Sequence, residues 1–258
     1  MAKILVGIPC YGACEYLSTT LKSLRDQTFK DFETLIYVDG IQGSTGRIPN
    51  SDTDIILTRE NRGLGTAYYE IGAWAHRRGI PYTFLLDNDA WLPPIFLELA
   101  AKLFEYNPWL EYAGWKSEKP NEEAPLLGSI ELPPSFFPIA EYTTQLCGCG
   151  LMFNTKHYDL FDRQYRVFYQ DSDFCGRIEG PGVRMWGPKL WHVEHQTIEA
   201  SIKLTSYKEQ DYDHYISKWE VSPEQTELEY REYLKEFFQE EKLQFPMPDG
   251  SLKEVTVQ

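Results

Sequence analysis

Positive charge and long hydrophobic stretches are both scarce in this sequence. Acidic residues outnumber basic ones by 39 to 25, the formal net charge is −14, and Lys and Arg never form a run. Nucleic-acid-binding proteins and proteins that dock on anionic membranes carry basic patches, so we expect neither class. No apolar run approaches the roughly 20 residues that cross a bilayer, so we expect no transmembrane segment. A membrane-bound acceptor would have to be met peripherally, from solution.

Cysteine is also scarce, with five residues, an odd number. The chain opens on the strand-like Lys3–Ile8 and not on the charged and apolar regions of a secretory signal. We therefore expect reduced thiols in a cytoplasmic protein. The pair Cys147 and Cys149 has the wrong spacing for a zinc knuckle, so we interpret it as a packing feature and not as a pair of metal ligands.

Short hydrophobic runs alternate with helical periodicity in the first half of the chain. The order is strand, helix, strand, strand, helix, strand, helix, which predicts an α/β fold with a mostly parallel central sheet flanked by helices. The predicted strands cover 3–8, 33–38, 54–57 and 81–86, and the helices between and after them carry Leu17, Tyr69 and Ile95 on their apolar stripes.

The second half of the chain has a weaker pattern. We expect a long loop over 117–142 as a lid or acceptor-side wall, strands at 148–154 and 182–186, and a helix from Asp171. From about Tyr207 the chain becomes helical and acidic, and its last dozen residues are expected to fray. The predicted organisation is a core domain over 1–203, with a nucleotide-binding half to about 115 and an acceptor half from 116, and a helical C-terminal extension over 204–258. This extension is a candidate surface for a homo-oligomer.

Polar breaks follow three predicted strands, at 9–12, 39–40 and 87–89. The carboxyl ends of parallel strands meet at one rim of the sheet, where ligands of such folds bind. Two acids one residue apart, Asp87 and Asp89, can share a divalent cation with a ribose or diphosphate, and oxygen ligands suit Mg²⁺ or Mn²⁺. The alternative is an ordinary strand-end turn, in which Asp and Asn form local hydrogen bonds. The strand before the triplet and the proline-started helix after it favour the metal site.

Five motifs in this order resemble the family 2 glycosyltransferases with a GT-A fold, in particular rhamnosyltransferase-like members. They are ILVGIPCY at 4–11, LxxLxxQ at 21–27, VDG at 38–40, NRGLG at 61–65 and DND at 87–89. The resemblance covers roughly 3–200. It implies metal-dependent, inverting transfer of a sugar from a UDP- or dTDP-sugar to a hydroxyl of a glycan, lipid-linked or protein acceptor. It further implies a Mn²⁺ or Mg²⁺ cofactor and a place in polysaccharide biosynthesis.

The resemblance also implies roles for individual residues of the donor site. Pro9 and Tyr11 would line the nucleotide pocket, and Asp39 would accept a hydrogen bond from a pyrimidine N–H, although the family usually has two acids at this point. The turn at 61–65 would lie near the base and diphosphate, and the small residues at 148–150 near the donor sugar. The implied donor-binding residues are Pro9, Tyr11, Asp39, Asn61, Arg62, Gly63, Asp87, Asn88, Gly148, Cys149 and Gly150.

For the metal, the resemblance implies Asp89 as a direct ligand and Asp87 near the ribose or the ion. The family often adds a His after the last core strand, and here there are two candidates, His192 and His195. Distance from the Asp171 segment favours His195, whereas the preceding aromatic residue favours His192, so both stay candidates. The one that does not bind the ion is expected to be a hydrogen-bonded packing residue.

The segment YQDSDF at 169–174 resembles the family's acid-acid-x-acid motif, with Gln170 in place of the first acid. Asp171 would then be the catalytic base that takes a proton from the acceptor hydroxyl. The alternative is a helix N-cap, a position that favours Asp, and one residue can do both. Asp173 lies four residues before Arg177, so we assign it to an ion pair and to structure.

Two other classes of function fit the pattern less well. A nucleotidyltransferase that makes nucleotide-sugars usually carries a Gly-rich stretch with a basic residue after the first strand, and 9–12 has no basic residue. A non-catalytic glycan- or partner-binding relative would not need both the acid triplet and Asp171. Turnover of a donor separates the enzyme from such a binding protein.

Overall fold

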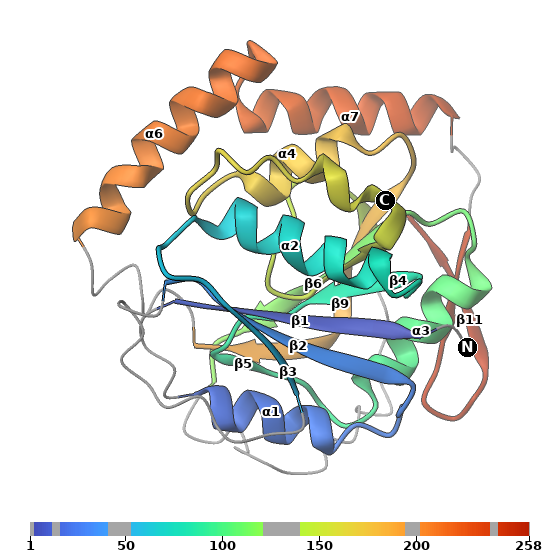
Figure 1. The fold of residues 1–258 in the computed structure, drawn as a ribbon. Helices are drawn as coiled ribbons and strands as arrows, with labels where there is room; N and C mark the ends of the chain where they lie inside the picture. Colours follow the sequence, from blue (N-terminus) through green and yellow to red (C-terminus); the bar gives the residue numbers. More distant parts are fainter. Residues whose placement is uncertain are drawn as a thin grey trace.

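The computed structural model describes residues 3–11, 16–40, 53–120, 140–193, 202–237 and 242–257. Its helices are α1 (Leu17–Arg25), α2 (Leu64–Arg77), α3 (Phe96–Tyr106), η2 (Thr155–Leu160), α4 (Gln170–Arg177), α6 (Ile202–Trp219) and α7 (Pro223–Phe237). Its strands are β1 (Ile4–Cys10), β2 (Phe32–Val38), β3 (Asp54–Leu57), β4 (Tyr82–Leu85), β5 (Ala90–Trp91), β6 (Tyr112–Glu118), β7 (Ala140–Tyr142), β8 (Leu151–Asn154), β9 (Gly182–His192), β10 (Lys242–Pro246) and β11 (Leu252–Thr256) (Figure 1).

Within these described ranges, a nine-stranded sheet forms the centre of the molecule, in the order β3-β2-β1-β4-β8-β6-β9-β5, with β7 beside β9. Strands β3, β2, β1 and β4 are parallel, so their carboxyl ends share one edge. Strand β8 runs antiparallel to both β4 and β6, whereas β6 and β9 are parallel. The predicted α/β sheet flanked by helices is confirmed, and it is parallel in its first half and mixed in its second.

Strand β1 shows why helices cover both faces of the sheet. All seven of its residues are buried. Ile4, Val6 and Ile8 join a hydrophobic cluster with α1 and α3, whereas Leu5 joins a second cluster that includes Ile71 of α2. Figure 1 accordingly shows α1 on one side of the sheet and α2 with α4 on the other. Complete burial of one such aliphatic side chain contributes about 1.5–3 kcal/mol, so these two layers account for much of the fold's stability.

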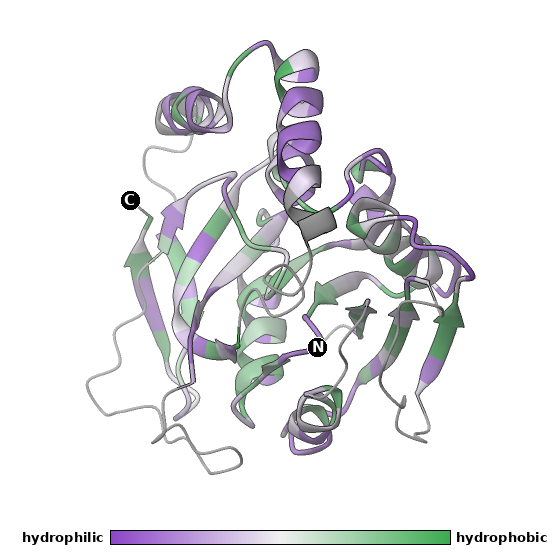
Figure 2. Ribbon diagram, turned by 90° about the vertical axis from the view of Figure 1, so that its left-hand side faces the viewer, coloured by the Kyte–Doolittle hydropathy of each residue, from purple (hydrophilic) through white to green (hydrophobic). Residues whose placement is uncertain are grey.

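Hydropathy separates the buried sheet from the exposed surface of the helices. Figure 2 shows hydrophobic residues concentrated in the sheet and a largely hydrophilic surface along the long helix α6. None of the helices described is both long and apolar enough to cross a membrane.

Two expectations for the second half of the chain need correction. The loop expected over 117–142 starts inside β6 and ends inside β7, while 121–139 lies outside the described residues. The last dozen residues do not fray, because β11 pairs antiparallel with β10. Strand β10 is fixed to α3 by the fully buried Asn107, whose amide donates to the carbonyl of Gln244 over 2.9 Å and accepts from its N–H over 2.8 Å. The C-terminal extension is therefore helical up to Phe237 and ends in a β-hairpin.

Candidate active site

A cavity of about 540 Å³ lies at the carboxyl edge of the parallel strands. As predicted, β2 and β4 contribute the polar residues that follow them. The break expected at 9–12 begins inside β1, which extends to Cys10, so β1 contributes its last two residues and Tyr11. The rest of the lining comes from 145–149, from 166–172 and from Lys208 of α6. The predicted site residues that line it are Pro9, Tyr11, Asp39, Asn61, Gly63, Asp87, Asn88, Asp89, Gly148, Cys149, Asp171 and His192.

Three of the predicted residues are not among those that line the cavity. The side chain of Arg62 lies 3.6 Å from Glu70 in an exposed ion pair, and only its backbone amide serves the site. Gly150 has a φ of +84° and binds the sheet, since its N–H donates to the carbonyl of Leu85 over 2.9 Å. His195 lies outside the described residues.

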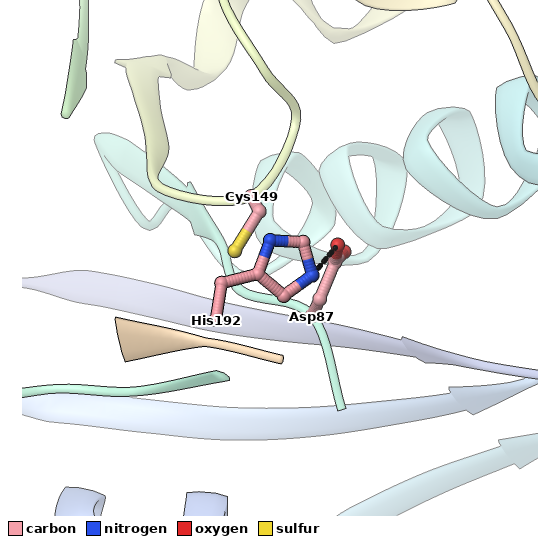
Figure 3. Close-up of side chains that lie close together, drawn as sticks. All are labelled: Asp87, Cys149 and His192. Carbon is pink, nitrogen blue, oxygen red and sulfur yellow. Dashed lines mark ion pairs between the residues drawn. The ribbon is translucent and has the colours of Figure 1, made fainter. Parts of the chain in front are cut away.

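A cluster of two carboxylates, Asp87 and Asp89, and the imidazole of His192 lies on the cavity wall. Figure 3 shows His192 beside Asp87. The short strand β5 pairs with the end of β9 so that Ala90 lies opposite His192. This register brings the imidazole next to the acid triplet. His192 Nε2 lies 3.2 Å from Asp87 Oδ2 and 3.1 Å from Asp89 Oδ1. Of the two histidine candidates, the described structure therefore brings His192 to the acids.

The electrostatics of this cluster favour positive charge. Burial lowers the pKa of His192, but its hydrogen bonds to Asp87 and Asp89 outweigh that effect and raise the pKa well above its ordinary value. The two carboxylates thus hold a proton on the ring. The same convergence of two carboxylate oxygens and a ring nitrogen suits a divalent cation such as Mn²⁺ or Mg²⁺. Asp87, Asp89 and His192 therefore fit the metal that the family resemblance implies.

A thiol completes this cluster. Sγ of Cys149, one carboxylate oxygen of Asp87 and one ring nitrogen of His192 all lie within 4.8 Å of one another. Cys149 is 1% exposed, and burial raises the pKa of its thiol to about 11, with the nearby charge of Asp87 acting in the same direction. In Figure 3 the sulfur lies beside the imidazole ring, on the side away from Asp87. The interpretation of the Cys147 and Cys149 pair as a packing feature did not predict that Cys149 lies beside Asp87 and His192.

Asp171 lies at the start of α4, on the same cavity as the acid–histidine cluster. Tyr169 adopts a left-handed conformation (φ 62°) and is the N-cap residue, so the alternative in which Asp171 caps the helix is wrong. Instead, Oδ2 of Asp171 accepts a hydrogen bond from the N–H of Gly148 over 2.9 Å, and Oδ1 accepts one from the N–H of Ser172 over 3.0 Å.

The protonation of Asp171 is set mainly by desolvation. Burial raises its pKa to about 6, the backbone hydrogen bonds from Gly148 and Ser172 partly oppose this, and the charge of Asp87 adds to it. A carboxylate with a pKa near 6 is ionised at neutral pH, yet it is a stronger base than an ordinary Asp. An ionised carboxylate of this kind on the cavity wall can accept a proton from a hydroxyl group bound beside it.

Asp173 has the structural role that its spacing predicted, with different main partners. It is fully buried and accepts hydrogen bonds from Lys218 Nζ and Trp219 Nε1 of α6, each over 2.8 Å. The predicted partner Arg177 lies 3.8 Å away. These contacts fix α4 against the C-terminal helices.

Asp39 organises the turn that follows β3. Its side chain is 4% exposed, and its two carboxylate oxygens accept hydrogen bonds from the backbone N–H groups of Arg62 and Gly63, each over 2.8 Å. Gly63 has a φ of +93°, a conformation that favours glycine, and its Cα packs against the backbone of Arg166. The turn is thereby held against the cavity.

Several residues in and behind the cavity wall escaped the sequence analysis. Arg166 lines the cavity, and its Nη2 donates to both the carbonyl and the side-chain oxygen of Asn61, over 3.0 and 3.1 Å. Asp211 of α6 is 2% exposed and accepts hydrogen bonds from three successive backbone N–H groups, those of 166–168. Tyr68 is buried against Gly148, where a Cβ would overlap its hydroxyl. No local motif surrounds these residues. The apolar stripe of α2 was expected on the side of Tyr69, whereas the structure buries Tyr68.

The sheet, its flanking helices and the site at its carboxyl edge define the α/β GT-A class of fold. Residues 5–165, more than half of the chain, match the model of the family described as glycosyl transferase family 2. The chain belongs to this family, which confirms the resemblance seen in the motifs.

The relatives agree with this placement. Glycosyltransferase GlyA of Streptococcus pneumoniae serotype 4 is 30% identical over 110 residues, which are 40% of this chain and 15% of GlyA. The chain thus spans a small part of the length of this curated relative. TarS 1–349 of S. aureus in complex with UDP-GlcNAc superposes with a TM-score of 0.59 at 14% identity, over 92% of this chain and 73% of that one. The mannosyltransferase PcManGT of Pyrobaculum calidifontis, in complex with GDP-Man and Mn²⁺, gives 0.56 at 14% identity, over 83% and 64%. At these identities the structures show a shared fold.

Proposed function

We propose that the protein is a metal-dependent, inverting glycosyltransferase that moves a sugar from a UDP- or dTDP-sugar to an acceptor hydroxyl. The observation that carries the proposal is that Asp171 and the cluster of Asp87, Asp89 and His192 open onto one cavity. Sugar transfer needs a base at the attacking oxygen and positive charge at the departing diphosphate, and this cavity offers groups for both.

The donor nucleotide would occupy the part of the cavity lined by Pro9, Tyr11, Asp39 and Asn61. Each carboxylate oxygen can accept two hydrogen bonds, so Asp39 can bind the turn and still accept one from a pyrimidine N–H. Arg166 carries a positive charge on the same wall. TarS binds UDP-GlcNAc on a similar fold, which supports a uridine donor, whereas PcManGT binds GDP-Man, so the base has to be tested.

In the proposed mechanism Asp87, Asp89 and His192 would hold Mn²⁺ or Mg²⁺. When bound, such an ion neutralises the charge that develops on the diphosphate leaving group. Asp171 takes the proton from the acceptor hydroxyl as that oxygen attacks C1 of the donor sugar. The bond from C1 to the diphosphate oxygen breaks, the nucleoside diphosphate leaves, and a single displacement inverts the anomeric carbon. Gly148 holds the Asp171 carboxylate in place through its N–H.

Calorimetric titration tests the donor site. UDP, dTDP and GDP are each added with and without Mn²⁺ to the native protein, to Asp89→Ala and to Asp213→Ala, which removes an exposed carboxylate of α6 that does not line the cavity. We expect Mn²⁺-dependent binding of UDP or dTDP that falls at least tenfold in Asp89→Ala and is unchanged in Asp213→Ala. Binding of none of the three nucleotides to the folded protein would reject the donor site and favour a non-catalytic relative.

Donor turnover tests the chemistry separately. Asp171→Asn should keep nucleotide binding within about threefold, because it preserves the shape of the side chain, and should reduce release of the nucleoside diphosphate from a nucleotide-sugar by 10² or more, a typical contribution of a general base. Unchanged turnover in this variant would assign the base elsewhere.

A further inference from the structure

The sulfur of Cys149 lies beside Asp87 and His192, two of the residues proposed to hold the ion. Sulfur is a soft ligand, which the hard ions Mn²⁺ and Mg²⁺ do not need. Three elements of the fold contribute to it: Asp87 follows β4, Cys149 precedes β8, and His192 ends β9. Strand β8 lies directly beside β4, and the pairing of β5 with β9 brings His192 to the same place. A sulfur, a ring nitrogen and a carboxylate oxygen consequently lie within 4.8 Å of one another on the cavity wall.

Burial holds the side chains of this cluster close together. Cys149 is 1% exposed and His192 is 8% exposed, so neither side chain is free to move into solvent. Metal distances of about 2.3 Å to sulfur and 2.0–2.2 Å to nitrogen and oxygen place two ligands of one tetrahedral ion roughly 3.5 Å apart. Because the sulfur and Asp87 lie on different sides of the imidazole ring, the side chains have to shift before one ion can contact all three. Cys147, two residues away, is exposed and lies outside this cluster.

We propose that Cys149 is a metal ligand together with Asp87 and His192, and that the site therefore selects a borderline ion such as Zn²⁺ or Co²⁺ over Mn²⁺ and Mg²⁺. Thiolate and imidazole ligands favour Zn²⁺ and Co²⁺, whereas sites made of carboxylate oxygens favour Mg²⁺ and Mn²⁺. When the ion binds, the metal–sulfur and metal–nitrogen bonds form, the thiol S–H bond and one N–H bond of the protonated imidazole break, and both protons pass to solvent. With Asp89 as a further ligand, as in the proposed function, an ion that expands to five-coordination keeps one position open for a water molecule or a diphosphate oxygen.

This inference rests on the proposed function only for what the ion does during transfer; the ligand set can be tested on the protein alone. Co²⁺ is added to the metal-free native protein, to Cys149→Ser and to the matched thiol control Cys147→Ser, and absorption spectra are recorded. We expect a thiolate-to-Co²⁺ charge-transfer band in the near ultraviolet and intense tetrahedral bands in the visible. Both should persist in Cys147→Ser, and the charge-transfer band should be lost in Cys149→Ser.

Metal affinities and X-ray absorption complete the test. Zn²⁺ affinity should fall at least tenfold in Cys149→Ser, while Mn²⁺ affinity changes less than threefold. X-ray absorption at the zinc edge of the native protein should show one sulfur at about 2.3 Å, a readout that does not depend on the folding of any variant. A Co²⁺ spectrum or a zinc edge without sulfur would overturn the proposal. Nucleotide binding with Mn²⁺ but no sulfur ligation would reject this inference alone, and sulfur ligation without nucleotide binding would reject the proposed function alone.

Discussion

The raised pKa of Asp171 makes the stability of the protein depend on pH in a direction unusual for a carboxylate. In the folded state burial raises this pKa from an ordinary value of 3.8 to about 6. The folded protein therefore holds the proton more tightly than the unfolded chain does. The contribution of Asp171 to stability is complete below pH 3.8 and is lost as the pH rises through about 6. Replacing Asp171 by Asn, which does not ionise, removes this dependence.

The magnitude follows from the two pKa values. At pH 8 Asp171 is ionised in both states, whereas at pH 5 it is mostly protonated in the folded state and ionised in the unfolded chain. As the pH falls from 8 to 5, linkage raises the free energy of unfolding of the native protein by about 1.4 kcal/mol relative to that of Asp171→Asn. About 0.8 kcal/mol of this increase is reached by pH 5.5. Linkage fixes only the pH dependence of this difference, because Asn would also turn an amide N–H₂ group toward the backbone N–H of Gly148 or Ser172 at every pH.

Urea unfolding followed by tryptophan fluorescence measures this difference at pH 8, 7, 6, 5.5 and 5, with a chelator present to remove divalent ions. Asp213→Asn, an exposed carboxylate of α6, serves as the matched control and should show no pH-dependent difference above about 0.3 kcal/mol. A difference between the native protein and Asp171→Asn that stays constant, or that changes in favour of the native protein toward pH 8, would refute the reasoning. Where donor turnover is measurable, kcat/KM should fall tenfold per pH unit below about 6.

Three further substitutions test the walls of the cavity. Gly148→Ala places a Cβ on the hydroxyl of the buried Tyr68; we expect a loss of about 1–3 kcal/mol in urea unfolding, and an unchanged midpoint would contradict the close packing. Asp211→Ala leaves three backbone N–H groups of the cavity wall without their acceptor; a loss of about 2–4 kcal/mol is expected, and a loss below 1 kcal/mol would show that water replaces the carboxylate. Asp39→Asn turns an amide N–H₂ group toward one of two backbone N–H donors. We expect the free energy of unfolding to fall by about 1–3 kcal/mol and the nucleotide affinity in the calorimetric assay to fall as well. An affinity equal to that of the native protein would limit Asp39 to a structural role.

The half of the site that lies at the ends of parallel strands could be predicted from the sequence. A buried strand followed directly by a polar break is a local signal, and the topology of such sheets brings the breaks to one edge. Asp39 and Asp87 were identified in this way, and strand β3 has the predicted bounds of 54–57. The choice between His192 and His195 could not be made, because it depends on the pairing of the two-residue strand β5 with the end of β9. A pair of two residues leaves no periodicity to recognise.

The side chains that reach the site from distant parts of the sequence were missed for a different reason. Asp211 and Lys218 lie in an acidic, polar helix whose charges resemble an ordinary solvated face. The structure buries Asp211 beneath the segment that carries Arg166, so its role depends on where α6 packs and not on its neighbours in the sequence. Cys149 was judged by its spacing from Cys147, whereas its important neighbours are Asp87 and His192, from other strands.

The C-terminal helices are part of the site rather than an appendage to it. The match to the family ends at residue 165, before the proposed base. Beyond that point the conformation of the cavity wall is imposed by α6: the carboxylate of Asp211 gathers three backbone N–H groups of 166–168, and Lys218 and Trp219 hold the buried Asp173 two residues after Asp171. A buried carboxylate that loses such partners is left uncompensated, which is strongly destabilising. The position of the proposed base therefore depends on helix packing outside the matched region, and changes in α6 should alter Asp171 before they alter the acid triplet that follows β4.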